Sequence, residues 1–169
     1  TLFNLLGPIT NPAGVPNQVL GVYDKQWLRP IAEVLRDLGS NHVLVVHSAD
    51  GLDEISIADE TYVAELKDGE ISEYTISPEQ FGMSRGNLED LTVADADESL
   101  SVVRGILGGK QSSATDIVAL NSGAAIYAAG IASSLQQGVI IAQDVLASGV
   151  AEEKLKELVE MSSTIKAAE

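Results

Sequence analysis

The sequence predicts an α/β fold: a mostly parallel sheet with a β-hairpin, flanked by helices and ending in a run of carboxyl-terminal helices. Residues 43–46 are apolar at every position, which is typical of a central strand covered on both faces. An apolar strand at 18–23 precedes them, and the helical pattern of 24–38 lies between the two. Strand, helix and strand in this order predict a parallel crossover unit. Beyond residue 95 the apolar residues recur at helical spacing.

The amino-terminal elements have clear boundary signals. The opening TLFNLL, residues 1–6, is mostly apolar and runs into a loop that contains Gly7, Pro8, Asn11, Pro12, Gly14 and Pro16, which indicates the end of a short helix. Asp24 is placed to cap the helix that follows, Pro30 fits its first turns, and Gly39 ends it. Apolar and polar residues then alternate on both sides of Asp68-Gly69, a pair that strongly favours a hairpin turn.

The rest of the chain is predicted to be helical. Asp95 and Glu98 have the spacing of a capping box at the start of the first of these helices. In the last helix we expect Leu155, Leu158 and Val159 to face inward. The predicted helices span 95–107, 113–131, 134–148 and 152–161.

The bulk properties limit the classes of function. At 169 residues the chain fits a single α/β domain, 1–169, and its start at Thr1 rather than Met suggests a fragment of a longer protein. A net charge of −15 argues against nucleic acid and anionic membranes as partners. The absence of cysteine excludes disulfides and thiolate chemistry. With no signal peptide and no membrane-spanning run in the sequence, we expect a cytoplasmic protein.

The segment HSADGLDEIS, residues 47–56, is the main candidate site. It places Asp53 and Glu54 just beyond the carboxyl end of the central strand, where open parallel sheets bind ligands. Adjacent carboxylates repel, so a cation stabilises them, and Mg²⁺ commonly takes one or two carboxylates together with phosphate oxygens and water. On composition alone, a solvated acidic turn is the simpler interpretation.

Other polar features have simpler explanations. His42 and His47 are five residues apart in a strand, so they face opposite sides and cannot share a metal. The segment LGGKQSS, residues 107–113, lacks the spacing of a phosphate-binding P-loop and is better explained as a helix end and loop. Asn121 and Ser122 lie in an apolar helix, where we expect a local hydrogen bond in the core.

The opening NLLGPITNPAG, residues 4–14, is unusually stiff. Gly7 permits close approach of another backbone, and the two prolines, Pro8 among them, fix φ. Asn4 and Asn11 offer side-chain hydrogen bonds. The segment could be a preorganised binding loop or an ordinary stiffened connection.

Four long blocks together resemble anthranilate phosphoribosyltransferase, in order and essentially end to end. They are TLFNLLGPITNPAGVPNQVLGVYD, VLVVHSADGLDEIS, VAELKDGEISEYTISPEQFGM and ATDIVALNSGAAIYAAG. The resemblance covers nearly the whole chain but only the carboxyl-terminal half of the family's usual length. It implies a nucleoside phosphorylase/phosphoribosyltransferase-like catalytic domain. One departure is VADADES, residues 93–99, where the family often has Gly-Gly-Asp, and this loop receives no role.

The resemblance also implies an activity. The family transfers the phosphoribosyl group of phosphoribosyl pyrophosphate to anthranilate, with release of pyrophosphate, in tryptophan biosynthesis, and its members are typically homodimers. It assigns Mg²⁺ binding to Asp53 and Glu54, and substrate contact along the anthranilate path to Gly7 and Pro8. No residue is assigned as a nucleophile or base, because the aromatic amine attacks directly.

Two other classes of function remain open from the sequence. One is a relative with the same fold, either a pyrimidine nucleoside phosphorylase or a paralogous transferase. The other is a non-catalytic acidic interaction domain. The family's glycine-rich phosphate loop and its basic anthranilate and phosphate contacts precede the position of Thr1, and this chain has only ten Lys and Arg residues. We therefore expect the chain alone to be inactive as a transferase.

Overall fold

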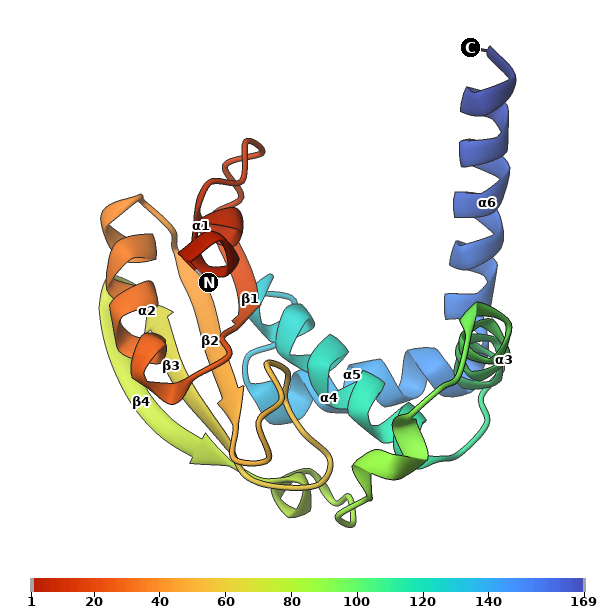
Figure 1. The fold of residues 1–169 in the computed structure, drawn as a ribbon, viewed down its shortest axis with the longest axis horizontal. Helices are drawn as coiled ribbons and strands as arrows, with labels where there is room; N and C mark the ends of the chain where they lie inside the picture. Colours follow the sequence, from red (N-terminus) through yellow and green to blue (C-terminus); the bar gives the residue numbers. More distant parts are fainter. Residues whose placement is uncertain (1, 169) are drawn as a thin grey trace.

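The computed structural model describes the backbone of residues 2–168 and the side chains of residues 6–165. A four-stranded sheet lies between one helix on its outer face and a pair of helices on the other, and a long final helix projects away from this body (Figure 1). The helices are α1 (Leu2–Ile9), α2 (Leu28–Asp37), α3 (Ala96–Leu107), α4 (Ser113–Ala128), α5 (Leu135–Ser148) and α6 (Val150–Ala168). The strands are β1 (Asn17–Gly21), β2 (His42–Ser48), β3 (Thr61–Lys67) and β4 (Glu70–Ile76). Short 3₁₀ turns occupy Lys25–Trp27, Pro78–Phe81 and Leu88–Leu91.

The strands are arranged in the order β1-β2-β3-β4. The α/β class, the parallel crossover pair and the hairpin are all confirmed: β1 and β2 are parallel, and β3 and β4 are antiparallel. The expectation of a mostly parallel sheet needs correction, because β2 and β3 also pair antiparallel, so the described sheet is mixed. The reason is that the acidic loop returns the chain directly to the neighbouring position, without a crossover helix.

The core lies on both faces of the sheet, which explains the uninterrupted apolar run of β2. Val43 and Val45 pack with α2, whereas Leu44 and Val46 pack with α4 and α5. All four side chains are fully or almost fully buried. Because successive side chains of a strand point to opposite faces, a strand between two helical layers must be apolar at every position.

The predicted helix caps and the hairpin turn, which depend on a few neighbouring residues, are found in the structure. Asp24 accepts a hydrogen bond from the backbone N–H of Gln26, although it caps the 3₁₀ turn that precedes α2 rather than α2 itself. Asp68 and Gly69 have φ of 53° and 83°, the left-handed values that a tight hairpin turn requires. At the start of α3, Asp95 accepts from the N–H of Glu98 at 2.9 Å, whereas the Glu98 carboxylate accepts from the N–H of Ala94 at 2.7 Å, so the cap forms but the predicted capping box is displaced by one residue.

Helix α6 is longer than predicted and does not bury its apolar face. Leu158 and Val159 are 62% and 55% exposed, and Leu155 is half-buried. The expectation that these three residues face inward is therefore wrong for the last two, Leu158 and Val159. Figure 1 shows α6 leaving the body of the molecule. Apolar periodicity fixes which side chains share a face of a helix, but not what lies against that face.

A buried polar cluster joins the sheet to α4 at the amino end of β2. His42 Nε2 lies 2.8 Å from a carboxylate oxygen of Glu65, and the Tyr74 hydroxyl donates to the other oxygen at 2.8 Å. The ring of Tyr127 on α4 meets His42 edge-on, and Lys67 donates to its hydroxyl. Burial favours the neutral form of Glu65, but its hydrogen bonds outweigh that effect and lower its pKa. His42 is thus a satisfied structural histidine.

Helices α4 and α5 pack at a contact between two glycines. A Cβ added to Gly138 would lie 2.2 Å from the carbonyl oxygen of Gly123, and one added to Gly123 would lie 2.6 Å from the Cα of Val139. The two helix backbones therefore approach too closely for any side chain at these positions.

This contact predicts that Gly138→Ala destabilises the protein. The added methyl group meets backbone atoms, which cannot rotate away, so we expect a loss of about 1–3 kcal/mol in the free energy of unfolding. Urea denaturation measures the loss. Gly105→Ala is the matched control, because its Cβ would meet only the Lys110 side chain, at 3.5 Å or more. A Gly138→Ala protein as stable as this control would contradict the packing argument.

Candidate functional site

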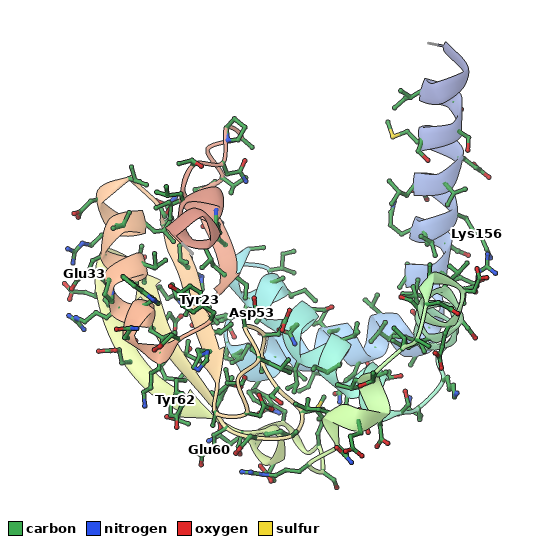
Figure 2. All side chains as sticks on the ribbon, viewed as in Figure 1. Tyr23, Glu33, Asp53, Glu60, Tyr62 and Lys156 are labelled. Atoms are coloured by element: carbon green, nitrogen blue, oxygen red, sulfur yellow. The ribbon has the colours of Figure 1, made fainter. Side chains whose placement is uncertain are left out.

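The acidic loop leaves the carboxyl end of β2 and returns at the start of β3. Asp53 and Glu54 are both exposed, and Figure 2 shows Asp53 on the concave side of the molecule, near the end of β1. The parallel ladder ends at the same place, where the Val22 N–H donates to the Val46 carbonyl at 2.9 Å. The pair therefore lies at the carboxyl ends of the parallel strands, as predicted.

The two carboxylates interact unfavourably when both are charged. The pKa of Glu54 is raised above its usual value by desolvation, by the negative charge of Asp53 and by a hydrogen bond with it. Loss of solvent and a nearby like charge both disfavour the charged form. A bound cation would relieve this repulsion, so the electrostatics of the pair are compatible with a metal site.

Three buried hydroxyl groups hold the backbone of this loop. The Ser48 hydroxyl donates to the Glu54 carbonyl at 2.6 Å, so Thr61 must donate to Ser48 across their 2.7 Å contact. Both oxygens accept from the N–H of Ser56, each at 3.1 Å. Ser48, Ser56 and Thr61 are all almost fully buried. Buried polar groups that are fully paired fix one conformation, and here that conformation presents the acidic pair.

The opposite side of the loop is closed by Asp50. One carboxylate oxygen accepts from the N–H of Leu52 at 3.1 Å, and the other accepts from the Ser56 hydroxyl. Asp50 is thereby committed to bonds within the loop. Of the three acidic residues in segment 47–56, Asp50 is therefore the one whose carboxylate holds the loop together, and Asp53 and Glu54 are the exposed neighbouring pair.

Gly21, the last residue of β1, lets the loop cross the end of that strand. A Cβ added to Gly21 would lie 1.5 Å from the Asp53 carbonyl oxygen and 2.6 Å from its carbonyl carbon. No other residue type fits there. The role of Gly21 was not predicted from the sequence, although a glycine inside a strand is a recognised sign of close backbone approach.

Asn121, on α4, bonds to the residue that follows Glu54. Its side-chain oxygen accepts from the Ile55 N–H at 3.0 Å, and its nitrogen donates to the Ile55 carbonyl at 2.9 Å. The predicted local bond is also present, to the Ile117 carbonyl at 2.9 Å. The contact with Ile55, 66 residues away in the chain, could not be inferred from the sequence.

The donor set fits Mg²⁺ as a shared ligand rather than an enclosed ion. Among the residues that the structure describes, no three His, Cys, Asp or Glu side chains converge on one point. Asp53 and Glu54 would thus supply at most two protein ligands. Mg²⁺ usually keeps several waters and completes its shell with substrate phosphate oxygens, which two outward carboxylates permit.

Gly7 and Pro8 lie in α1 (Leu2–Ile9), so the expectation that they begin a loop is wrong and the helix continues through them. A Cβ at Gly7 would meet no atom within 4 Å, so within the described chain no backbone approaches it. Pro8 is half-buried and lines a cavity of 90 Å³ together with Asn11. Asn11 accepts from the N–H of Ala13 at 3.0 Å, a local turn bond. The side chain of Asn4 lies outside the described residues.

The remaining candidates have structural explanations. The Nδ1 of His47 lies 2.9 Å from the Val22 carbonyl, which can only accept, so this nitrogen carries the proton. Ser112 caps α4 by accepting from the N–H of Thr115. The segment 107–113 is therefore a helix end, a loop and a cap, as expected, and not a phosphate loop.

Comparisons with known proteins show which family the chain belongs to. A model of the glycosyl transferase family, a/b domain, matches residues 1–152. The anthranilate phosphoribosyltransferase of Marinomonas sp. (strain MWYL1) is 60% identical over 160 residues, which cover 94% of this chain and 46% of the relative. That of Hahella chejuensis is 57% identical over 173 residues, covering 100% and 50%. The chain thus spans about half the length of the curated relatives it matches.

Solved structures agree with the sequence comparison. The crystal structure of anthranilate phosphoribosyltransferase from Thermus thermophilus matches with a TM-score of 0.87 and 43% identity, over 95% of this chain and 47% of that chain. The Saccharomyces cerevisiae enzyme in complex with PRPP and Mg has a TM-score of 0.86 at 24% identity, over 97% and 48%, which shows the shared fold.

The Gly21 contact predicts a test of how the loop is placed. Gly21→Ala should lower the free energy of unfolding by about 1–3 kcal/mol and shift the NMR amide signals of the acidic loop, because the methyl group must displace Asp53. Gly7→Ala, where nothing lies within 4 Å, serves as the control and should leave both unchanged or slightly stabilise α1. If Gly21→Ala leaves stability and loop signals unaltered, the loop does not cross β1 as described.

Proposed function

Because the chain belongs to the glycosyl transferase family through its α/β domain, we propose that it forms the metal-binding part of a phosphoribosyltransferase site. The reaction moves the phosphoribosyl group of phosphoribosyl pyrophosphate to anthranilate and releases pyrophosphate, a step of tryptophan biosynthesis. Support comes from the identity to anthranilate phosphoribosyltransferases, including 60% to the Marinomonas enzyme and 43% to the Thermus enzyme. The resemblance noted in the sequence is thereby confirmed.

The observation that carries this proposal is the acidic pair on a rigid loop at the carboxyl ends of β1 and β2. Asp53 and Glu54 would hold Mg²⁺ that is shared with the pyrophosphate of the substrate. Bound Mg²⁺ would neutralise the charge that develops on the leaving oxygens. The contribution of the protein is to keep both carboxylates directed outward before the substrate arrives, which lowers the cost of reorganisation during reaction.

No side chain of this chain is proposed as a nucleophile or base. The amine nitrogen of anthranilate forms a bond to the ribose C1 while the bond from C1 to pyrophosphate breaks, and the amine proton leaves to solvent. Catalysis of this kind relies on positioning and charge neutralisation. The proton of His47 Nδ1 is committed to the Val22 carbonyl, which leaves that histidine in a structural role.

We further propose that Gly7 and Pro8 contact anthranilate. We also propose that the protein is cytoplasmic and that it works as a homodimer. The exposed Gly7 and the half-buried Pro8 leave room for a ligand beside α1. No helix in the described part of the chain is long and apolar enough to cross a bilayer. The remaining half of the site is proposed to come from the portion of the relatives that this chain does not span.

The activity is tested by a chimera. The amino-terminal half of the Hahella relative is joined ahead of Thr1, and phosphoribosylanthranilate formation is followed by the loss of anthranilate fluorescence. We expect Mg²⁺-dependent turnover by the chimera and none by the 169-residue chain alone. Asp53→Asn with Glu54→Gln should raise the Mg²⁺ requirement of the chimera and lower its turnover by more than about tenfold, because loss of groups that only orient metal ligands already costs about that much.

Asp59→Asn with Glu60→Gln is the matched control, because it removes an acidic pair from the far end of the same loop. It should leave the Mg²⁺ requirement unchanged. Detectable transferase activity of the isolated chain would contradict the need for a second half, and unchanged Mg²⁺ dependence in the Asp53/Glu54 variant would contradict the metal assignment.

The anthranilate contact is tested in the same chimera with Gly7→Val. A branched side chain on α1 should occupy the space beside Pro8 and raise the KM for anthranilate by about tenfold or more, since about 1.4 kcal/mol of lost binding is tenfold. The KM for phosphoribosyl pyrophosphate should change much less. Equal changes in both constants would indicate general damage and remove the proposed role.

A further inference from the structure

Asn121 makes an unusually complete set of contacts for a polar residue in an apolar helix. Both polar atoms of its amide bond to Ile55, one to the N–H at 3.0 Å and one to the carbonyl at 2.9 Å. This is the pairing that one residue of an extended strand makes with its neighbour. The second hydrogen of its NH₂ group goes to the Ile117 carbonyl within α4. Both N–H donors of the side-chain amide and one of the two lone pairs of its oxygen are thus used.

The bonded residue directly follows the acidic pair. Ile55 is 2% exposed and packs in the core beside α4. The carbonyl of Glu54, in the same peptide group as the Ile55 N–H, accepts from Ser48 on β2, and the carbonyl of Asp53 lies against Gly21 on β1. The backbone that carries the two carboxylates is therefore held from β1, from β2 and, through Asn121, from the helical layer.

Helix α4 is a rigid support for this contact. Its approach to α5 at Gly123, two residues beyond Asn121, leaves no space for the helix to shift toward its partner. At its far end, Tyr127 packs on His42 of β2 and accepts from Lys67 of β3. Both contacts limit sliding and rotation of α4, so the amide of Asn121 has a fixed place relative to the sheet.

We propose that Asn121 is a positioning residue for the Asp53–Glu54 metal site, acting through the Ile55 peptide. This inference rests on the proposed function of that pair. Without the amide, the Ile55 N–H and carbonyl would be buried without these partners, and the loop would have to open to hydrate them. Opening would let the carboxylates move apart, which lowers the repulsion between them and weakens their joint hold on a cation.

The test uses the 169-residue chain and Mn²⁺ alone, as a paramagnetic substitute for Mg²⁺. Water proton relaxation gives the Kd for Mn²⁺, and Asp53→Asn with Glu54→Gln gives the background from the remaining acidic surface. In Asn121→Ala we expect the site-specific Kd to rise by about tenfold, the lower range for loss of a group that orients metal ligands. Amide hydrogen exchange at Ile55 should accelerate by about tenfold or more.

Thr115→Val is the matched control on the same helix. It removes a buried hydroxyl that bonds to Lys110 and Ser112 near the start of α4, without touching the acidic loop. Its stability should fall, whereas Mn²⁺ affinity and Ile55 exchange should stay as in the parent. If Asn121→Ala does not fold, Asn121→Ser replaces it, because a serine hydroxyl can bond to the Ile117 carbonyl but cannot pair with both groups of Ile55.

The outcomes separate this inference from the proposed function. Mn²⁺ binding that depends on Asp53 and Glu54 but is as tight in Asn121→Ala as in the parent would overturn the positioning role and leave the metal site intact. The positioning role would also be overturned if the Ile55 amide hydrogen in Asn121→Ala exchanges no faster than it does in Thr115→Val. Binding that is indifferent to the acidic double substitution would instead overturn the metal assignment, and the positioning role with it.

Discussion

Two carboxylates that are adjacent in the chain repel each other, and the candidate metal site depends on a backbone that keeps them together. The pKa of Glu54 is raised, first by desolvation and then by the negative charge of Asp53 and a hydrogen bond with it. The opposing constraint is a set of paired, buried polar groups: the Ser48 hydroxyl on one side and the Asn121 amide on the other. Each such group would be costly to leave unpaired, so the loop cannot relax without breaking several bonds at once.

The features that could be predicted from the sequence are those set by short segments. The buried strand β2, the Asp68-Gly69 turn and the cap at Asp95 depend on neighbours a few residues away, and all were confirmed. The antiparallel pairing of β2 with β3 and the exposed face of α6 were not predicted, because both are decided by which distant element lies alongside. Local patterns carry no information about that choice.

The same distinction applies to the site. The position of Asp53 and Glu54 followed from a general rule about strand ends, and the structure places them there. Gly21 and Asn121 were missed as parts of the site because each acts on the loop from another layer of the fold. The available signals were a glycine within a strand and an amide within an apolar helix, and each has several common explanations when read alone.

The glycine contact between α4 and α5 has a consequence for how the protein responds to heat or denaturant. Proteins open in cooperative units before they unfold as a whole. At its closest point this contact brings the Gly138 backbone against the Gly123 carbonyl, and backbone atoms cannot rearrange as a side chain can to preserve it. If the helical pair separates first, Asn121 leaves the loop with it. Cation affinity would then decline at temperatures where the sheet is still intact, so the onset of local melting would be seen at the carboxylates before it is seen in the secondary structure.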